Sequence, residues 1–417
     1  MKFTIPREAL LKPLQLVTGV VERRQTLPVL ANLLIQADDK GLSLTGTDLE
    51  VGMIDRCIVP IEQPGEVTIP ARKLADIWRA LPDGADVSVV VEGERAVIRS
   101  GRSRFTLATL PAVDFPKVEN ADSDVVVSLP QSQIGKLIDQ VSFALAQQDV
   151  RVFLNGMLLE VGDGRLKAVA TDGHRLAMAS QACETNADSG VIKQAIVPRK
   201  AVVEMARLLD EEDETLSLQL GSNHLKVTKG GITLTTKLVD GQFPDYEKVV
   251  PKDASRVLSG DRDTLKQGFQ RASILSNEKY RGVRLAISPD SLMIQANNPE
   301  QEEAEETVPV QFSGDQLEIG FNVSYLLDVL SVIDSDQVQM SVSDANSKCG
   351  ATCGAHCGRA WAADCCQEGE GCFAQLSLAP CEVEVEGTPI EVWNETTTFL
   401  ATPTLANLSS YTLTEPM

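Results

Sequence analysis

One short segment of the chain carries residue types that could do acid–base chemistry. It reads Thr171-Asp172-Gly173-His174-Arg175-Leu176. A carboxylate beside an imidazole can move protons near neutral pH. The same residues also fit a polar turn, because Asp-Gly pairs favour turns and a His-Arg pair suits a surface. We favour the turn over catalysis.

The rest of the sequence offers no partners for such chemistry. The three histidines, His174, His224 and His356, do not belong to an H-E-x-x-H metal motif. The sequence contains neither a G-x-x-x-x-G-K-[ST] phosphate loop nor a G-x-S-x-G nucleophile elbow. We therefore predict a protein that is not an enzyme and needs no cofactor.

Two charged runs of opposite sign lie far apart in the chain. The acidic residues 300–306 could bind a metal, although such runs are more often solvated faces. Arg95, Arg99, Arg102 and Arg104 form a basic counterpart. Complementary ends favour head-to-tail association of copies, which closes a ring when the rotation allows.

The charged runs and the 171–176 segment lie within a unit that is repeated along the chain. The segment Val67–Leu74 is echoed by Ala195–Val202, and Leu110–Pro116 is echoed by Leu238–Pro244, so that Pro70 to Pro198 and Phe115 to Phe243 share one offset. Two landmarks at one offset indicate an internal repeat. Each unit opens with residues at helical spacing. These are Leu10, Leu14, Val17 and Val21, then Ile134, Leu137, Ile138, Val141 and Leu145, then Leu265, Phe269, Ala272 and Leu275.

A second helix and closing strands are predicted in each unit. The helices are expected at Arg72–Leu81, Arg199–Leu209 and Asn322–Ile333, the first two directly after proline. Alternating residues predict the strand pairs Val87–Val91 with Ala96–Ser100 and Leu216–Leu220 with Leu225–Thr228, and a single strand Val338–Val342.

We therefore predict three α+β domains with mostly antiparallel sheets, at residues 1–122, 123–252 and 253–347. The third unit lacks the usual closing strands, because its pattern stops at Ser347.

Residues 348–417 do not resemble the repeat. Seven of the nine cysteines fall here. Zinc is one interpretation of the cysteines around His356, the one stretch that offers ligands at suitable spacing. Structural zinc sites usually use paired Cys-x(2–4)-Cys units with a spacer, and we predict no metal site. A disordered or out-of-frame extension is the favoured interpretation. The segments Glu382–Glu386 and Ile390–Trp393 alternate like strands that could patch the third sheet.

The net charge of −21 argues against simple nucleic-acid binding. Lysines and arginines nevertheless recur at equivalent helices of the units, which indicates one shared positive face. These are Lys12, Lys136, Lys266, Arg72, Lys73, Arg79, Arg199, Lys200 and Arg207. The first residues do not read as a signal peptide and the longest apolar stretches are interrupted by charge, so we expect a cytoplasmic protein without membrane contact.

Residues 1 to about 347 resemble the bacterial DNA polymerase III beta subunits, the sliding clamps. The resemblance rests on colinear segments. They are Met1–Thr4, Ser43–Glu50, Arg99–Phe105, Leu154–Leu158, Thr171–Leu176, Lys237–Gly241 with Phe243–Tyr246, Ile274–Lys279, Asn297–Glu306 and Ile319–Tyr325.

The resemblance implies a homodimeric ring of six similar domains, with helices lining the hole and sheets outside. Such a ring is a processivity factor that encircles duplex DNA without reading its sequence. A clamp loader would place it on DNA, and replicative and repair polymerases would dock short linear motifs into a pocket between the second and third domains.

The resemblance also implies residue roles. The DNA-facing residues would be Arg24, Arg72, Gln148, Arg199 and Lys200. The partner-peptide pocket would comprise Leu154, Thr171, Gly173, His174, Arg175, Leu176, Pro244, Val249, Asn322 and Tyr325. The dimer interface would comprise Lys73, Arg95, Arg102, Arg104, Phe105, Ile274, Leu275, Glu300, Glu302, Glu303, Glu305 and Glu306.

The chain departs from the family at its C-terminal segment, where the usual closing strands and short apolar-basic ending are absent. This departure motivates an alternative hypothesis, an assembly-defective clamp relative with a metal-responsive or disordered cysteine-rich tail.

Overall fold

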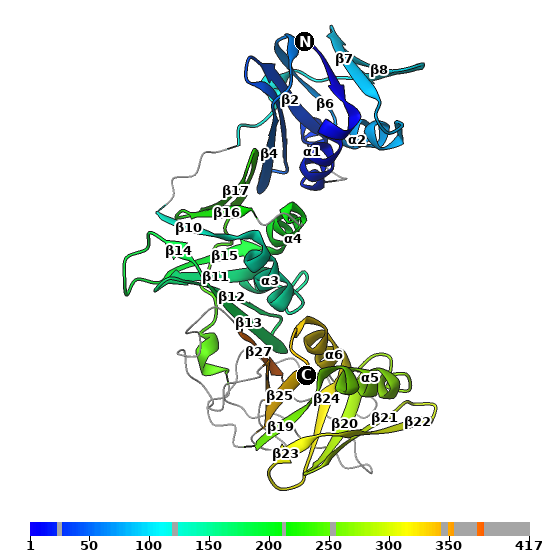
Figure 1. Ribbon diagram of the computed structural model, residues 1–417, viewed down its shortest axis with the longest axis vertical. Coiled ribbons are helices and arrows are strands. Elements are labelled where there is room, and N and C mark those ends of the chain that lie inside the picture. Colours follow the sequence, from blue (N-terminus) through cyan, green and yellow to red (C-terminus); the bar gives the residue numbers. More distant parts are fainter. Residues whose placement is uncertain are drawn as a thin grey trace, which may run out of the picture. The chain divides into compact units, whose positions relative to one another are not determined.

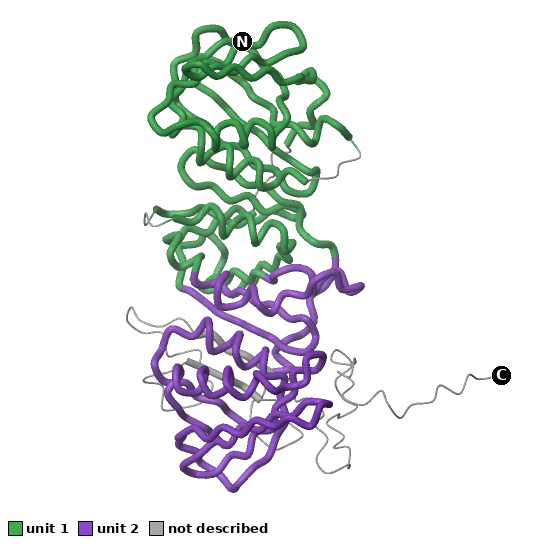
Figure 2. Tube along the Cα trace, turned by 90° about the vertical axis from the view of Figure 1, so that its right-hand side faces the viewer, with its two compact units in different colours: residues 1–135, 159–166, 182–240 green, residues 136–158, 167–181, 241–417 purple. Residues whose placement is uncertain are grey.

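The computed structural model describes residues 1–22, 27–118, 124–210, 214–250 and 256–342, and the backbone of residues 349–353 and 373–378. The chain divides into two compact units (Figure 2). The first unit comprises residues 1–135, 159–166 and 182–240, and the second comprises residues 136–158, 167–181 and 241–417. No helix within the described ranges is long and apolar enough to cross a membrane.

Helices and strands recur in the same order along the chain (Figure 1). The first repeat contains β1 Lys2–Pro6, α1 Arg7–Gly19, β2 Asn32–Asp38, β3 Gly41–Thr47, β4 Val51–Cys57, β5 Ile61–Gln63, β6 Gly65–Pro70, α2 Ala71–Ala80, β7 Asp86–Glu92, β8 Arg95–Ser100 and β9 Ser103–Ala108. The second contains β10 Val125–Pro130, α3 Gln131–Ser142, β11 Gly156–Gly162, β12 Arg165–Thr171, β13 Arg175–Ala182, β14 Glu184–Thr185, β15 Lys193–Pro198, α4 Arg199–Leu208, β16 Thr215–Leu220, β17 His224–Lys229 and β18 Ile232–Lys237. The third contains β19 Arg256–Asp261, α5 Arg262–Ser273, β20 Gly282–Ser288, β21 Ser291–Asn297, β22 Glu303–Pro309, β23 Gln311–Ser313, β24 Leu317–Asn322, α6 Val323–Val332 and β25 Gln337–Val342. Short 3-10 turns occupy η1 Pro28–Ala31, η2 Ala112–Asp114, η3 Val152–Asn155 and η4 Tyr246–Lys248.

The second helix of each repeat is confirmed within one residue at each end, a normal uncertainty of helix boundaries. The opening helices α1, α3 and α5 are confirmed as well, but Val21, Leu145 and Leu275 lie beyond their ends. Their apolar residues are buried as the helical spacing requires. In α1, Leu10, Leu14 and Val17 are at most 1% exposed, and in α2 Trp78 is fully buried. Each repeat therefore covers a sheet with the apolar stripe of its helices.

The first unit holds two antiparallel sheets. The smaller has the strand order β5-β1-β7-β8-β9. The larger has the order β14-β10-β16-β17-β18-β4-β3-β2-β6, and it joins two repeats, because β18 of the second pairs with β4 of the first. Leu234 lies opposite Met53 in that pairing. Each of these meanders also has a third strand, β9 or β18, that was not predicted from the sequence.

The second unit holds a sheet with the order β22-β21-β20-β24 and the strand run β13-β27-β26-β25-β19-β23. In this run β26 Cys349–Cys353 pairs with β25, and β27 Phe373–Leu378 pairs with both β26 and β13. The sheet thus continues beyond Ser347, where the sequence pattern was expected to stop. The proposed patching segments Glu382–Glu386 and Ile390–Trp393 lie outside the described residues.

Candidate functional site

The segment 171–176 forms a tight turn between β12 and β13. The Asp172 carboxylate accepts hydrogen bonds from the backbone N–H groups of His174 at 2.9 Å and Arg175 at 3.0 Å. The Thr171 hydroxyl donates to the Arg175 carbonyl at 2.7 Å and accepts from the Gly173 N–H at 3.1 Å. Asp172 is thus engaged in shaping the turn, which supports the turn interpretation over an acid–base pair.

The side chain of Arg175 makes several polar and aromatic contacts at this turn. Its guanidinium donates to the carboxylates of Asp172 and Asp328 and, at 2.7 Å, to the Phe143 carbonyl. It also lies 4.6 Å from the centre of the Tyr325 ring and 5.2 Å from that of Phe143, within cation–π range. Arg175 is only 12% exposed, so these contacts fix a largely buried charge.

A second arginine packs against the same turn. Gly173 has φ +88°, and a Cβ there would meet the Arg151 guanidinium at 2.9 Å. Arg151 is held in place by two side-chain hydrogen bonds to Asp149, at 2.8 and 2.9 Å. The hydrogen bonds from Arg151 lower the pKa of Asp149 to about 2, so the pair stays charged at neutral pH.

All ten residues predicted for the peptide pocket lie in the second unit. The contacts described above bring Thr171, Gly173, His174, Arg175 and Tyr325 together. Of the others, Leu154 and Leu176 are buried, Pro244 and Val249 flank η4 half-buried, and the Asn322 side chain caps α6 by accepting from the Ser324 N–H. Sequence reasoning missed Phe143, Arg151 and Asp328, whose roles depend on contacts between residues distant in the chain.

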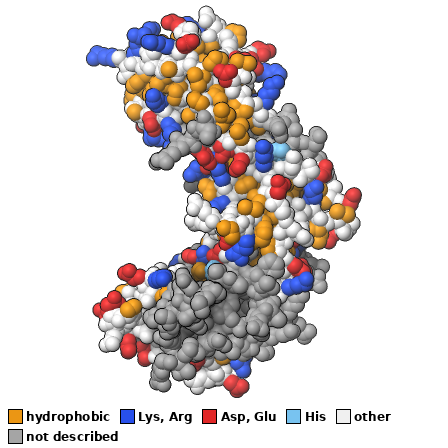
Figure 3. All heavy atoms as spheres, turned by 180° about the vertical axis from the view of Figure 1, so that it is seen from behind, with side chains coloured by type: hydrophobic (Ala, Val, Ile, Leu, Met, Phe, Trp, Pro, Cys, Tyr) orange, Lys and Arg blue, Asp and Glu red, His pale blue; other side chains and the backbone are white. Residues whose placement is uncertain are grey.

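The basic run of the predicted dimer interface lies at a sheet edge. Strand β9 is the outer strand of the five-stranded sheet. Arg104 lies on β9, Arg102 in the turn before it and Arg95 at the start of the neighbouring β8, and all three are exposed. Phe105 is half-buried on β9, and Lys73 is exposed on α2. Figure 3 shows lysine and arginine side chains around the margin of the face that the first repeat presents in this view.

The acidic run lies at another sheet edge. Strand β22 is the outer strand of the four-stranded sheet and carries Glu303, Glu305 and Glu306. Glu300 and Glu302 precede it on the exposed surface. Glu306 accepts two hydrogen bonds from Arg271, at 2.8 and 2.9 Å, which lower its pKa.

An apolar side chain lies close to each charged run, with Phe105 on β9 and Ile274 after α5, the helix that packs against β22. Ile274 is 75% exposed just after α5, and Leu275 is half-buried beside it. Outer strands carry backbone N–H and C=O groups ready to pair with another strand. Each edge thus combines backbone pairing capacity, an apolar group and charges of one sign.

The predicted DNA-facing residues differ in their surroundings. Arg72 is exposed on α2 and donates to the Val21 carbonyl at 3.2 Å, and Gln148 is exposed with φ +57°. Arg199 and Lys200 open α4 and are half-buried. Arg24 lies outside the described residues.

Lys200 is tied to the first repeat. Its ammonium donates to the carboxylates of Glu22 at 3.0 Å and of Asp48. Burial alone would lower the pKa of Lys200, but these hydrogen bonds outweigh it and the pKa is raised. Lys200 therefore remains charged, with part of that charge neutralised by Asp48 and Glu22.

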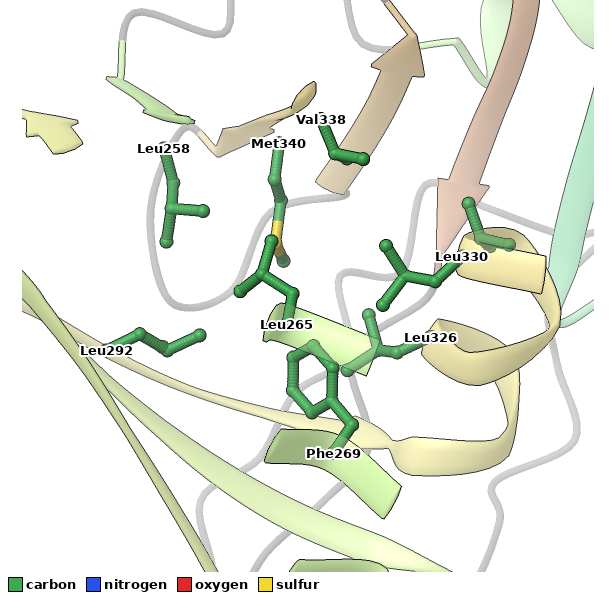
Figure 4. A pocket seen from close by; sticks show the side chains of 9 residues that line it. Leu258, Leu265, Phe269, Leu292, Leu326, Leu330, Val338 and Met340 are labelled. Carbon is green, nitrogen blue, oxygen red and sulfur yellow. The ribbon is translucent and has the colours of Figure 1, made fainter. Parts of the chain in front are cut away.

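A small cavity lies in the core of the third repeat (Figure 4). Leu265 and Phe269 of α5, Leu326 of α6 and Met340 of β25 point into it, as do other apolar side chains. Its lining carries no polar group, so it offers a ligand nothing to hydrogen-bond. Among the described residues, no group of three or more histidines, cysteines or carboxylates is arranged to hold a metal.

The DNA polymerase III beta subunit models match in succession, with the N-terminal domain at residues 1–119, the central domain at 128–245 and the C-terminal domain at 247–351. The beta sliding clamp of Pseudomonas aeruginosa is 57% identical over 348 residues, which cover 83% of this chain and 94% of that protein. The beta sliding clamp of Escherichia coli K12 is 53% identical over the same shares.

Solved structures agree. A crystal structure of a DnaN sliding clamp from Pseudomonas aeruginosa bound to griselimycin matches with a TM-score of 0.84 and 52% identity, covering 92% of this chain and all of that one. The Caulobacter crescentus pol III beta structure matches with a TM-score of 0.80 and 38% identity, over the same shares. With three clamp domains in the right order and these relatives, the chain belongs to the DNA polymerase III beta subunit family, the beta sliding clamps.

Proposed function

We propose that the protein is a DNA sliding clamp, a processivity factor that encircles duplex DNA as a homodimeric ring and tethers replicative and repair polymerases to it. The observation that carries this proposal is the pair of outer strands with opposite charges at them, β9 with Arg104 and the preceding Arg102, and β22 with its glutamates. Since each chain has one edge of each kind, two copies can join head to tail twice and close.

The ring proposal accounts for the charge of the chain. A net charge of −21 is unfavourable for a protein that holds DNA by phosphate contacts alone. A closed ring is retained by topology, so a few basic groups such as Arg72, Arg199 and Lys200 are enough to guide the duplex. Phosphate contacts of this kind are independent of DNA sequence.

The turn at 171–176, together with Tyr325, is proposed as the wall of a pocket for short linear motifs of partner proteins. The half-buried aromatic and apolar groups beside a fixed arginine suit an apolar peptide with a few polar contacts. A relative in the same family binds griselimycin, and we propose that this pocket does so here. A clamp loader would open the ring onto DNA in the cytoplasm, and the protein itself would catalyse no reaction.

The decisive test is retention on DNA. The protein is loaded by a clamp loader onto nicked circular DNA, and its release is followed before and after the circle is linearised. Rapid release only after linearisation is expected for a topological link. Equal release rates from intact and linearised circles would contradict the proposal.

A control variant separates ring closure from DNA contact. Replacing Arg72 with alanine removes one proposed DNA contact and leaves both edges intact, so retention on the circle should persist with a weaker salt dependence of loading.

A further inference from the structure

The carboxylate of Asp328 joins two repeats at the proposed peptide pocket. Asp328 lies on α6 of the third repeat, and Arg175 begins β13 of the second. The two side chains form an ion pair within the second unit, with Asp328 43% exposed and Arg175 12% exposed. Asp328 was not among the residues predicted for the pocket.

The other hydrogen bonds of Arg175 leave one terminal nitrogen of its guanidinium for Asp328. Asp172 and the Phe143 carbonyl, which both come from the second repeat, hold Nε and one terminal nitrogen of the guanidinium. Asp328 takes the other terminal nitrogen, while the Tyr325 ring, one turn earlier on the same helix, faces the guanidinium. Asp328 is therefore the charged partner that the third repeat supplies to Arg175.

This arrangement also sets the local charge. Arg175 brings one positive charge, and Asp172 and Asp328 bring two negative ones. With Asp328 present, two carboxylates neutralise the guanidinium charge, and Arg175 has little attraction left for a carboxylate of a ligand. Without the Asp328 carboxylate, Arg175 and Asp172 together carry no net charge. One terminal nitrogen of the Arg175 guanidinium can then donate to solvent or to a ligand.

We propose that Asp328 is a positioning residue of the peptide pocket. It holds the Arg175 guanidinium against Tyr325, and it makes the pocket select against peptides that carry a carboxylate near this wall. This inference rests on the proposed function of the pocket.

The test uses the full chain and two fluorescein-labelled peptides. One carries a polymerase clamp-binding motif, and the other is the same peptide with one flanking neutral residue replaced by glutamate. Titrations followed by fluorescence anisotropy compare the unsubstituted protein with D328N, D328E and the matched control E318Q. Glu318 is 50% exposed and pairs with Arg284, so E318Q also breaks one arginine pair of the third repeat.

D328N should bind the neutral peptide about fivefold more weakly, as expected for loss of a charge-assisted hydrogen bond. It should bind the glutamate peptide with less than about a twofold loss, because Arg175 is then free to pair with it. D328E, which keeps the charge, should restore much of the discrimination, and E318Q should leave both affinities unchanged.

If Asp328 had a purely structural role, D328N would bind both peptides more weakly by the same factor, and its melting temperature would fall in parallel. That outcome would overturn the inference. Unchanged affinities in D328N would overturn it as well, with the proposed function intact. If the folded, unsubstituted protein binds neither peptide, the proposed pocket itself is wrong and the inference fails with it.

Discussion

The carboxylate of Asp210 pairs with the ammonium of Lys229 at 2.7 Å and with that of Lys12 at the same distance. Lys12 lies on α1 of the first repeat, whereas Lys229 ends β17 of the second and is only 5% exposed. Gln131 adds a hydrogen bond at 2.8 Å. One carboxylate thus ties a helix of one repeat to a sheet of the next, and a lysine expected on the shared positive face takes part in this tie.

Substitution of Asp210 should destabilise the first unit. D210N leaves the buried Lys229 ammonium without its carboxylate partner, which should cost about 2 kcal/mol in the free energy of unfolding. Urea unfolding at pH 7 measures it. The exposed pair of Asp245 and Lys248 gives a matched control, and D245N should have no measurable effect.

The same variant should lose its effect in acid. Hydrogen bonds from Lys12, Lys229 and Gln131 hold the pKa of Asp210 well below its usual range. A depressed carboxyl pKa stabilises the fold above the ordinary aspartate pKa, and this contribution is lost as the pH falls through the folded-state value. The difference between D210N and the unsubstituted protein should therefore shrink below about pH 4; a difference that stays constant down to pH 2 would contradict it.

Glu204 should behave in the opposite sense. Its side chain on α4 is 4% exposed, Arg207 donates to Oε1 at 2.7 Å, and no described residue donates to Oε2. Burial raises the pKa of Glu204. Since the carboxyl is favoured in its protonated form, stability is greatest below the ordinary glutamate pKa and is lost as the pH rises through the folded-state value.

E204Q, which is neutral at every pH, should therefore be more stable than the unsubstituted protein at pH 8 and equally stable at pH 4. Thermal unfolding across this range measures the change, with the exposed Glu247 changed to glutamine as control. A stabilisation that does not depend on pH would mean that packing, and not charge, is responsible.

Ile274 should decide whether the ring closes. The side chain is 75% exposed in the single chain, and burying it at an interface contributes about 1.5–3 kcal/mol. A ring would contain the contact twice, so I274D should raise the dimer dissociation constant by at least about a hundredfold. Size exclusion with light scattering measures the mass of the assembly.

Ile58, which is 96% exposed and is not among the predicted interface residues, provides the control. I58D should leave the dimer intact. A monomeric unsubstituted protein would instead support the alternative of an assembly-defective relative.

Gly173 offers a test of the pocket wall. Alanine there meets both a positive φ of +88° and the Arg151 guanidinium at 2.9 Å, so the turn or Arg151 must move. G173A should weaken griselimycin binding at least about tenfold, corresponding to about 1.4 kcal/mol, without changing the mass of the dimer. Calorimetric titration measures the affinity.

Gly190 provides a matched control for G173A, because its backbone has a similar positive φ. Gly190 has φ +81°, and a Cβ added there would meet nothing within 4 Å. G190A carries a similar backbone cost of about 1 kcal/mol but touches nothing, so it should lower stability and leave griselimycin binding unchanged. Equal losses of binding in both variants would show that backbone strain alone is responsible.

Local patterns predicted much of this fold. The helical spacing of Leu10, Leu14 and Val17 and the prolines before α2 and α4 encode short-range structure, and the elements appear where expected. Alternation likewise predicted β7 and β8. These features depend on neighbours in the sequence, which a single chain displays directly.

Features made by distant residues were not predictable in this way. The pairing of β18 with β4 has no signature in either strand, because alternation does not name a partner. The contact of Asp328 with Arg175 spans 153 positions and looks like ordinary surface charge in the sequence. Strand β26 was missed because its cysteine-rich composition does not resemble a strand.

The pairing of β4 with β18 has a mechanical consequence. Five residue pairs of main-chain ladder join the first two repeats, so the link between them does not depend on the connecting peptide alone. If that connection were cut, the two pieces should remain associated and could be produced as separate chains that reassemble. A loader that pulls on the proposed ring would meet a continuous sheet and a covalent connection between the first two repeats, but only noncovalent contacts between copies, so the ring should open between copies.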